Sequence, residues 1–207
     1  MFEDRKDAGE KLARALAKYK DEDVLILAIP KGGVEVAYEV AKYFGTSFSL
    51  LIARKLPFPR NAEAGFGAVA EDGSTFIFEK AEGWVPPNLI EKIKRAQIRE
   101  IIRRIDVLRK GKPLPDMAGK TIILVDDGLA MGSTMRAAIM LCRNKGARQV
   151  VVAVPVAGRE VAEEIAATVD DLVVLEIPPV FYAVAQAYRN WYDVPDEEVL
   201  RIMAPST

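Results

Sequence analysis

This chain of 207 residues contains no histidine and a single cysteine, Cys142. The lack of histidine excludes Ser-His-Asp and Cys-His catalysis and every zinc site that requires imidazole. One cysteine can form neither an internal disulfide nor a thiolate metal cluster, so we expect a reduced, cytoplasmic setting. Any chemistry of this chain must therefore rely on carboxylates, lysine and arginine, backbone amides and a metal such as Mg²⁺.

The chain also lacks an excess of either charge and any long apolar run. Lys and Arg number 29 against 30 Asp and Glu, so we expect neither nucleic acid nor an anionic membrane as a partner. No apolar run approaches the roughly 20 residues that span a bilayer. The charged residues 1–7 do not resemble a secretory signal. Since 50% of the residues are apolar, the chain can bury the core of one domain.

One stretch, residues 121–134, organises the rest of the chain. Residues 121–125 (Thr-Ile-Ile-Leu-Val) are a short apolar run with β-branched side chains, typical of a strand buried on both faces of a parallel sheet. The run ends in Asp126 and Asp127, and a glycine-containing loop then leads to a helix predicted over residues 135–145. Open α/β sheets bind ligands at the carboxyl ends of such strands.

The loop after this strand has the features of a phosphate site. Gly128 and Gly132 allow close approach of the backbone, and the next helix adds the positive end of its dipole. Ser133 and Thr134 can donate hydrogen bonds or cap that helix. Two carboxylates would repel a phosphate unless they bind ribose hydroxyls or Mg²⁺, so a phosphorylated ribose is indicated. The alternative is an ordinary strand–turn–helix corner with an acidic turn.

A second strand and turn repeat this arrangement. Residues 24–29 are predicted to form a buried strand that runs into Pro30-Lys31-Gly32-Gly33, and residues 34–44 a helix. A cation and two glycines before a helix N-terminus indicate a second anion site. The alternative is a strand-to-helix turn that happens to use two glycines.

The remaining pattern predicts an α/β fold with an open, mainly parallel five-stranded sheet flanked by helices. Further strands are expected at residues 47–53, 149–156 and 171–177, helices at 4–20, 88–110 and 158–167, and a hairpin at 66–70 with 74–78. Residues 54–67 carry two prolines, two glycines and three cations. Such a segment is expected to be a long loop, either functional or simply solvated.

Residues 125–134, Val-Asp-Asp-Gly-Leu-Ala-Met-Gly-Ser-Thr, resemble the motif that binds phosphoribosyl pyrophosphate (PRPP) in type I phosphoribosyltransferases. The order of the other elements resembles that family over most of the chain. The resemblance implies a single domain over residues 1–207, with a lid loop at about 54–67 and a small hood from the N-terminal and C-terminal segments (about 178–207). It also implies Mg²⁺-dependent transfer of a phosphoribosyl group from PRPP to a base or other acceptor, with release of pyrophosphate. We further expect a homodimer.

The resemblance also implies roles for individual residues. Asp126 and Asp127 would hold the ribose hydroxyls, directly or through a metal-bound water, and count with Lys55 as catalytic. The 5′-phosphate would bind to Gly128, Leu129, Ala130, Met131, Gly132, Ser133 and Thr134, and the pyrophosphate to Lys31, Gly32 and Gly33. The lid would contribute Arg54, Lys55, Arg60 and Glu63, and the base hood Phe181, Tyr182 and Trp191. The same aromatic residues could instead be packing residues.

Met131 departs from the family pattern, which usually has Thr or Ser at this position, so one hydroxyl for the phosphate is missing. This departure supports an alternative function, a non-catalytic protein that binds PRPP or a nucleotide. Hydrolase chemistry is disfavoured because there is no Gly-x-Ser-x-Gly, histidine or Walker A motif. The acceptor base cannot be read from the sequence, because the hood varies most within the family.

Overall fold

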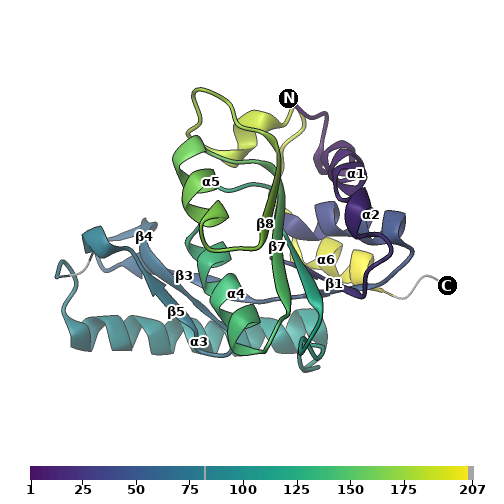
Figure 1. Cartoon of the computed structure of the whole chain (residues 1–207). Helices are drawn as coiled ribbons and strands as arrows, with labels where there is room; N and C mark the ends of the chain where they lie inside the picture. The colour runs from purple at the N-terminus through teal and green to yellow at the C-terminus, as the bar shows by residue number, and fades with distance from the viewer. Residues whose placement is uncertain (82, 205–207) are drawn as a thin grey trace.

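Five parallel strands form the central sheet in a computed structural model, which describes residues 1–81 and 83–204 and, for Glu63, only the backbone (Figure 1). The strand order is β2-β1-β6-β7-β8. The bounds are β1 (Val24–Ala28), β2 (Phe48–Leu50), β6 (Thr121–Val125), β7 (Gln149–Val156) and β8 (Asp171–Glu176). All five predicted strands are confirmed, with β6 at the centre, and the predicted α/β fold class is confirmed with them.

Helices cover both faces of this sheet, which explains the uninterrupted apolar character of β6. The helices are α1 (Arg5–Ala15), α2 (Gly33–Phe44), α4 (Ser133–Asn144) and α5 (Arg159–Ala166). Ile123 and Val125 pack with residues of α1 and α2, whereas Ile122 and Leu124 pack with residues of α4 and α5. Figure 1 shows the two helix pairs on opposite sides of the sheet. Because successive strand residues point to opposite faces, every residue of β6 is buried.

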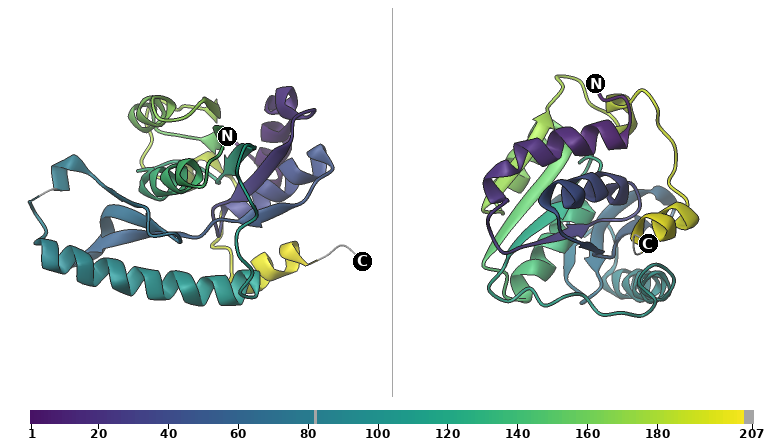
Figure 2. Two further views of the ribbon diagram at one scale, coloured as in Figure 1. Left: turned by 60° about the horizontal axis from the view of Figure 1, so that its bottom comes forward. Right: turned by 90° about the vertical axis from the view of Figure 1, so that its right-hand side faces the viewer.

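A second, three-stranded sheet and one long helix form an arm beside this body. The sheet has the order β3-β4-β5, with β3 (Ala53–Phe58), β4 (Asn61–Ala70) and β5 (Thr75–Ile77). Helix α3 (Pro87–Arg109) runs alongside these strands (Figure 2). The helix begins at Pro87, one residue before the expected start at residue 88, because proline is pre-organised for the first helical position.

The segment expected as a lid loop, residues 54–67, is mostly strand. It contains residues 54–58 of β3 and residues 61–67 of β4, and only Pro59 and Arg60 lie in the turn between them. Pro57 is tolerated because β3 is the edge strand and its pairing shifts on both sides of Pro57. Gly67 lies where a Cβ atom would come within 2.1 Å of the Phe76 carbonyl oxygen. The prolines and glycines thus indicate an irregular strand pair, and the expectation of a loop was wrong. The hairpin expected after it is confirmed as β4 and β5.

The N-terminal segment packs against residues 187–189 at the carboxyl edge of the central sheet. The Phe2 amide donates to the Ala187 carbonyl oxygen at 2.7 Å, and the Arg189 amide to the Phe2 carbonyl oxygen at 2.9 Å. Short helical segments complete the chain: η1 (Ala17–Tyr19), η2 (Glu79–Ala81), η3 (Val184–Ala187) and α6 (Asp196–Met203). No helix within residues 1–81 and 83–204 has both the length and the apolar character needed to cross a bilayer.

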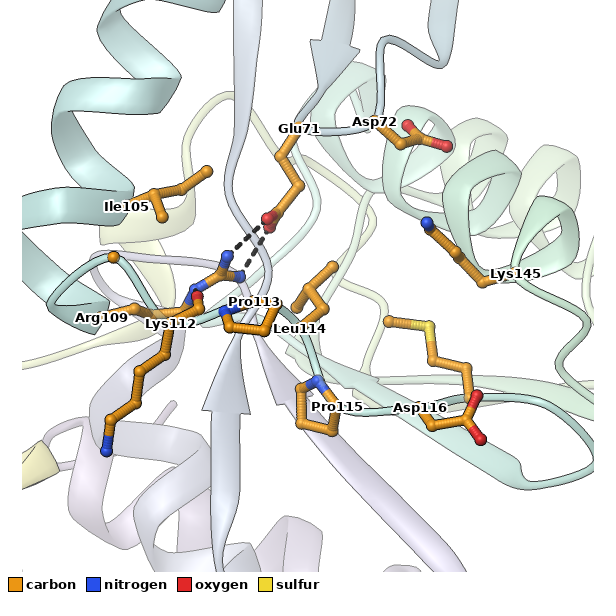
Figure 3. A pocket seen from close by; sticks show the side chains of 12 residues that line it. Glu71, Asp72, Ile105, Arg109, Lys112, Pro113, Leu114, Pro115, Asp116 and Lys145 are labelled. Atoms are coloured by element: carbon orange, nitrogen blue, oxygen red, sulfur yellow. Dashed lines mark hydrogen bonds and ion pairs between the residues drawn. The ribbon is translucent and has the colours of Figure 1, made fainter.

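A buried ion pair joins the arm to the body (Figure 3). Arg109, at the end of α3, donates from Nη1 and Nη2 to the two carboxylate oxygens of Glu71, at 2.9 and 2.6 Å. Its Nη1 also donates to the carbonyl oxygen of Leu50 in β2 at 2.8 Å. The two side chains are 4% and 8% exposed, and the Ile52 amide donates to Glu71 at 2.9 Å. One guanidinium therefore links α3, the end of β4 and the edge strand of the central sheet.

Replacing Arg109 by methionine should strongly destabilise the protein, because Glu71 would stay buried without its counter-charge. Removal of one partner of a buried pair costs about 3–5 kcal/mol of unfolding free energy. Urea unfolding monitored by circular dichroism measures this change. Arg103→Met is the matched control, since Arg103 pairs with Glu100 on the exposed side of the same helix. An equal shift of the unfolding midpoint in both variants would contradict the role of the buried pair.

Candidate ligand-binding site

A cavity of about 280 Å³ lies at the carboxyl end of β6. It is lined by Lys55, Gly65, Asp126, Gly128, Leu129, Ala130, Met131, Gly132, Ser133, Thr134 and Val184. All of the residues predicted for the 5′-phosphate and one of the two predicted carboxylates thus face one space. Lys55 reaches the same space from β3, far earlier in the chain.

The backbone of residues 130–134 is arranged to accept an anion. The Leu129 amide donates to the Val156 carbonyl oxygen at 2.9 Å, so it is already used. Across residues 1–81 and 83–204, no protein acceptor receives a hydrogen bond from the amides of residues 130–134. These amides open the helix α4, where the dipole favours negative charge. The hydroxyls of Ser133 and Thr134 do not cap this helix, whose N-cap is Gly132 without a side-chain hydrogen bond.

Two glycines in the loop are required by geometry. Gly132 has a φ angle of +70°, in the left-handed region that other residues rarely adopt. A Cβ atom on Gly128 would lie 2.7 Å from Val184 and 2.9 Å from Val156. Gly128 therefore also allows the C-terminal segment to close on the loop.

The two carboxylates after β6 have different surroundings. Asp126 lines the cavity and accepts a hydrogen bond from the Asp127 amide at 2.8 Å. Asp127 does not line the cavity, because its Oδ2 atom accepts from Nε of Arg5 at 2.8 Å. The Tyr188 hydroxyl donates to the Asp127 carbonyl oxygen at 2.6 Å. Asp126 thus faces the cavity, whereas Asp127 is bound by Arg5 behind it.

Burial raises the pKa of both carboxyls. The pKa of Asp126 is raised well above its usual range by burial and by the neighbouring charge of Asp127. Burial also raises the pKa of Asp127, although the charge of Arg5 and its hydrogen bond oppose this. Two desolvated carboxylates that touch one another favour a shared proton or a bound cation. A proton or a cation beside Asp126 and Asp127 is therefore stabilised.

The Pro30-Lys31-Gly32-Gly33 turn packs directly on the doublet. A Cβ atom on Gly32 would lie 1.8 Å from Oδ2 of Asp127, and one on Gly33 would lie 2.9 Å from the Cα atom of Asp126. Only glycine permits this approach. The peptide bond between Pro30 and Lys31 is cis. The ammonium group of Lys31 lies 3.4 Å from a carboxylate oxygen of Asp196 in α6, and both side chains are about one-third exposed.

The lid residues expected from the sequence point in different directions. Lys55 lines the cavity. Arg54 donates to the side-chain oxygen of Gln97 in α3 at 3.0 Å, and burial lowers its pKa. Arg60 is exposed in the β3–β4 turn, and the Glu63 side chain lies outside the described part of the chain. Among these residues with described side chains, the structure brings Lys55 alone to the cavity.

Comparison with known proteins places this geometry in a family. A family model described as a phosphoribosyl transferase domain matches residues 2–189. The chain belongs to the phosphoribosyl transferase domain family. The sequence-based assignment to phosphoribosyltransferases is thereby confirmed.

Individual relatives agree with this assignment. A Mycobacterium tuberculosis protein, provisionally named a phosphoribosyl transferase, is 36% identical over 205 residues, which are 98% of this chain and 46% of the relative. The chain therefore spans about half the length of that relative. The crystal structure of TT1426 from Thermus thermophilus is 36% identical with a TM-score of 0.83, and the match covers 98% of this chain and 97% of that one. The AQ2163 protein of Aquifex aeolicus is similar in fold, with 12% identity and a TM-score of 0.50 over 84% of this chain and 73% of that one.

The phosphoribosyl transferase hood expected from Phe181, Tyr182 and Trp191 is divided in the structure. Tyr182 is 83% exposed, and Trp191 stacks on Arg5, with the guanidinium carbon 4.0 Å from the ring centroid. Phe181 packs beside Gly158, where a Cβ atom would lie 3.3 Å from its ring. None of the three lines the cavity. Their contact with a base stays a prediction.

Sequence reasoning missed four residues of this site: Arg5, Gly65, Tyr188 and Val184. Arg5 lies in a charged helix start, where arginine is ordinarily solvated. Tyr188 and Val184 follow the last strand without a recognisable spacing. No signal in a single sequence pairs residues so distant along the chain.

Replacing Asp126 by asparagine should stabilise the metal-free protein at neutral pH. A carboxyl whose pKa is higher in the folded state binds its proton there more tightly, so stability falls as pH rises from the unfolded pKa (about 4) through the raised folded value. Asparagine removes this loss and keeps the acceptor for the Asp127 amide. We expect a melting temperature higher by at least about 2 °C at pH 7.5 in EDTA, with the difference shrinking towards pH 4.

Thermal melts of Asp126→Asn and wild type across this pH range measure the effect. The matched control is Asp21→Asn at an exposed position. A melting temperature that is unchanged or lower at pH 7.5, or a difference that grows as the pH falls, would contradict the raised pKa.

Proposed function

We propose that this chain transfers a 5-phosphoribosyl group from PRPP to a nitrogenous base or other acceptor, with release of pyrophosphate. One observation carries the proposal: a single cavity is lined by the open amides of residues 130–134, by Asp126 and by Lys55. These groups suit a phosphate, a sugar hydroxyl and a leaving anion, respectively. Membership of the phosphoribosyl transferase family supports the same chemistry.

In this proposal the 5′-phosphate binds to the amides of residues 130–134 and the hydroxyls of Ser133 and Thr134. Donors at a helix N-terminus and the helix dipole together stabilise a phosphate. Met131 contributes its amide to this cradle and projects no hydroxyl. Its side chain is 56% exposed at the cavity.

Asp126 would accept hydrogen bonds from the ribose hydroxyls, because it is the carboxylate of the doublet that faces the cavity. Lys55 and the Lys31 turn would hold the pyrophosphate. Lys31 would leave Asp196 to do so. Their partly exposed ion pair contributes little to stability, so the exchange is accessible.

The donor set fits Mg²⁺ in the way that phosphate-binding enzymes hold it. Mg²⁺ usually takes one or two carboxylates together with substrate phosphates and waters, not a complete protein cage. The described part of the chain, residues 1–81 and 83–204, contains no cluster of three or more carboxylate, thiol or imidazole ligands. Asp126 would hold the ion, with Asp127 nearby but already paired with Arg5. Bound there, Mg²⁺ would supply positive charge that neutralises the pyrophosphate oxygens.

Catalysis in this proposal is mostly positioning and charge neutralisation. The bond between the ribose anomeric carbon and the pyrophosphate oxygen breaks as the acceptor nitrogen attacks, through an oxocarbenium-like transition state. Lys55 stabilises the negative charge that develops on the leaving pyrophosphate. The β3–β4 hairpin, which supplies Lys55 and Gly65 to the cavity wall, limits the access of water. We also propose that the protein is a cytoplasmic homodimer. Size-exclusion chromatography with light scattering can test its oligomeric state.

Asp126→Asn should weaken the binding of Mg-PRPP by at least about tenfold, because a neutral amide accepts weaker hydrogen bonds and does not attract a metal. Isothermal titration calorimetry with Mg-PRPP measures this change. Asp116→Asn, at an exposed position on the linker before β6, is the matched control. Unchanged affinity in Asp126→Asn would remove Asp126 from the ribose site, and no binding to wild type would contradict the proposed function.

A second function, a non-catalytic protein that binds PRPP or a nucleotide, is supported by Met131. Pyrophosphate release across a panel of purines, pyrimidines and xanthine-like bases separates the two functions. We expect release with at least one acceptor. Tight binding of Mg-PRPP without turnover on any of them would favour the sensor.

Met131→Thr should strengthen binding of the 5′-phosphate, since a hydroxyl would replace an apolar side chain at the cavity. One additional hydrogen bond to a charged group contributes about 1.5–3 kcal/mol, which is roughly 10-fold or more in affinity. Titration with ribose 5-phosphate measures the gain, with Met140→Thr on the exposed face of α4 as the control. Equal or weaker binding would show that position 131 does not face the phosphate.

A further inference from the structure

Arg5 lies directly behind the acidic doublet and is almost completely buried. Its side chain is 3% exposed. Nε donates to Oδ2 of Asp127 at 2.8 Å, and Nη1 donates to the carbonyl oxygen of Tyr192 at 2.9 Å. Nη1 also lies 3.4 Å from a carboxylate oxygen of Glu35 in α2. One side chain from the first turn of α1 therefore contacts the doublet, the C-terminal segment and the helix after the glycine turn.

Aromatic rings enclose the same guanidinium. Its central carbon lies 4.0 Å from the ring centroid of Trp191, 5.3 Å from that of Tyr192 and 5.9 Å from that of Tyr188. A planar guanidinium can stack on a ring while its edge donates hydrogen bonds, which an ammonium group cannot do in the same way. The site is therefore shaped for arginine and fixes its orientation.

This arrangement determines the direction of the Asp127 carboxylate. Arg5 holds the side chain from behind, while Tyr188 holds the carbonyl oxygen of the same residue at 2.6 Å. The Gly32 backbone covers the contact, since a Cβ atom there would lie 3.1 Å from Nε of Arg5. Asp127 is thereby kept away from the cavity, and Asp126 alone lines it.

We propose that Arg5 is a positioning residue for the ribose site, acting through Asp127. Arg5 binds the carboxylate of Asp127, which leaves the carboxylate of Asp126 to bind the sugar. The positive charge of Arg5 also reduces the repulsion between the two carboxylates. The proposal rests on the proposed function, because it concerns the geometry in which PRPP is bound. It gives the N-terminal helix a part in ligand binding without contact with the ligand.

The experiment compares Arg5→Met, Arg5→Lys and wild type by calorimetric titration of Mg-PRPP. Loss of a residue that orients a metal ligand typically weakens metal binding about 10-fold to 100-fold, and we expect the same range for the binding of Mg-PRPP to Arg5→Met. Arg5→Lys keeps the charge but cannot reproduce both hydrogen bonds, so a smaller loss is expected. Arg14→Met, on an exposed turn of the same helix, is the matched control and should bind as wild type does.

A double-mutant cycle with Asp127→Asn separates positioning from general damage to the fold. If Arg5 acts through Asp127, the double variant should bind Mg-PRPP about as weakly as the weaker single variant. Additive losses, or an Arg5→Met affinity equal to that of wild type, would overturn the proposal. Should Arg5→Met fail to fold, the same double-mutant cycle is measured with Arg5→Lys, and additive losses would again overturn the proposal. Failure of wild type to bind Mg-PRPP would instead remove the proposed function itself, and the Arg5 role with it.

Discussion

Two adjacent carboxylates at the end of a fully buried strand are the constraint around which the site is built. Burial opposes the charge of both and raises the pKa of both carboxyls, and the charge of Asp127 raises the pKa of Asp126 further. Such a pair persists only where a cation, a proton or a set of donors compensates it. In this fold Arg5 compensates Asp127, and Asp126 is left at the cavity.

Several other features follow from that constraint. The glycine turn before α2 must be glycine at both positions, because the doublet lies within about two to three ångströms of any added Cβ atom. The pairing of Phe2 with residues 187 and 189 brings Arg5 and Tyr188 to Asp127 from distant parts of the chain. These two segments thus hold Asp127 in the interior of the site.

The arm contributes to the site from a different direction. Its hairpin supplies Lys55 to the cavity, while its base is fixed to the central sheet by the buried Arg109–Glu71 pair (Figure 3). A strand pair anchored at one end holds a cation more precisely than a free loop of the same length, because fewer backbone conformations are available to it. The part of the cavity wall that carries Lys55 therefore belongs to a folded strand pair and not to a free loop.

The sequence by itself determined the central sheet, the family and the glycine loop that we propose as the phosphate cradle. Buried parallel strands need uninterrupted apolar runs, and a cradle needs glycines and donors within one short loop, so both are local patterns. The tertiary structure alone decided which carboxylate faces the cavity, because Arg5 lies 122 residues from Asp127. It also decided that residues 54–67 are largely paired, since Pro57 is acceptable only at the edge of a sheet. Contacts between distant residues depend on packing, and a single sequence does not encode them in any local spacing.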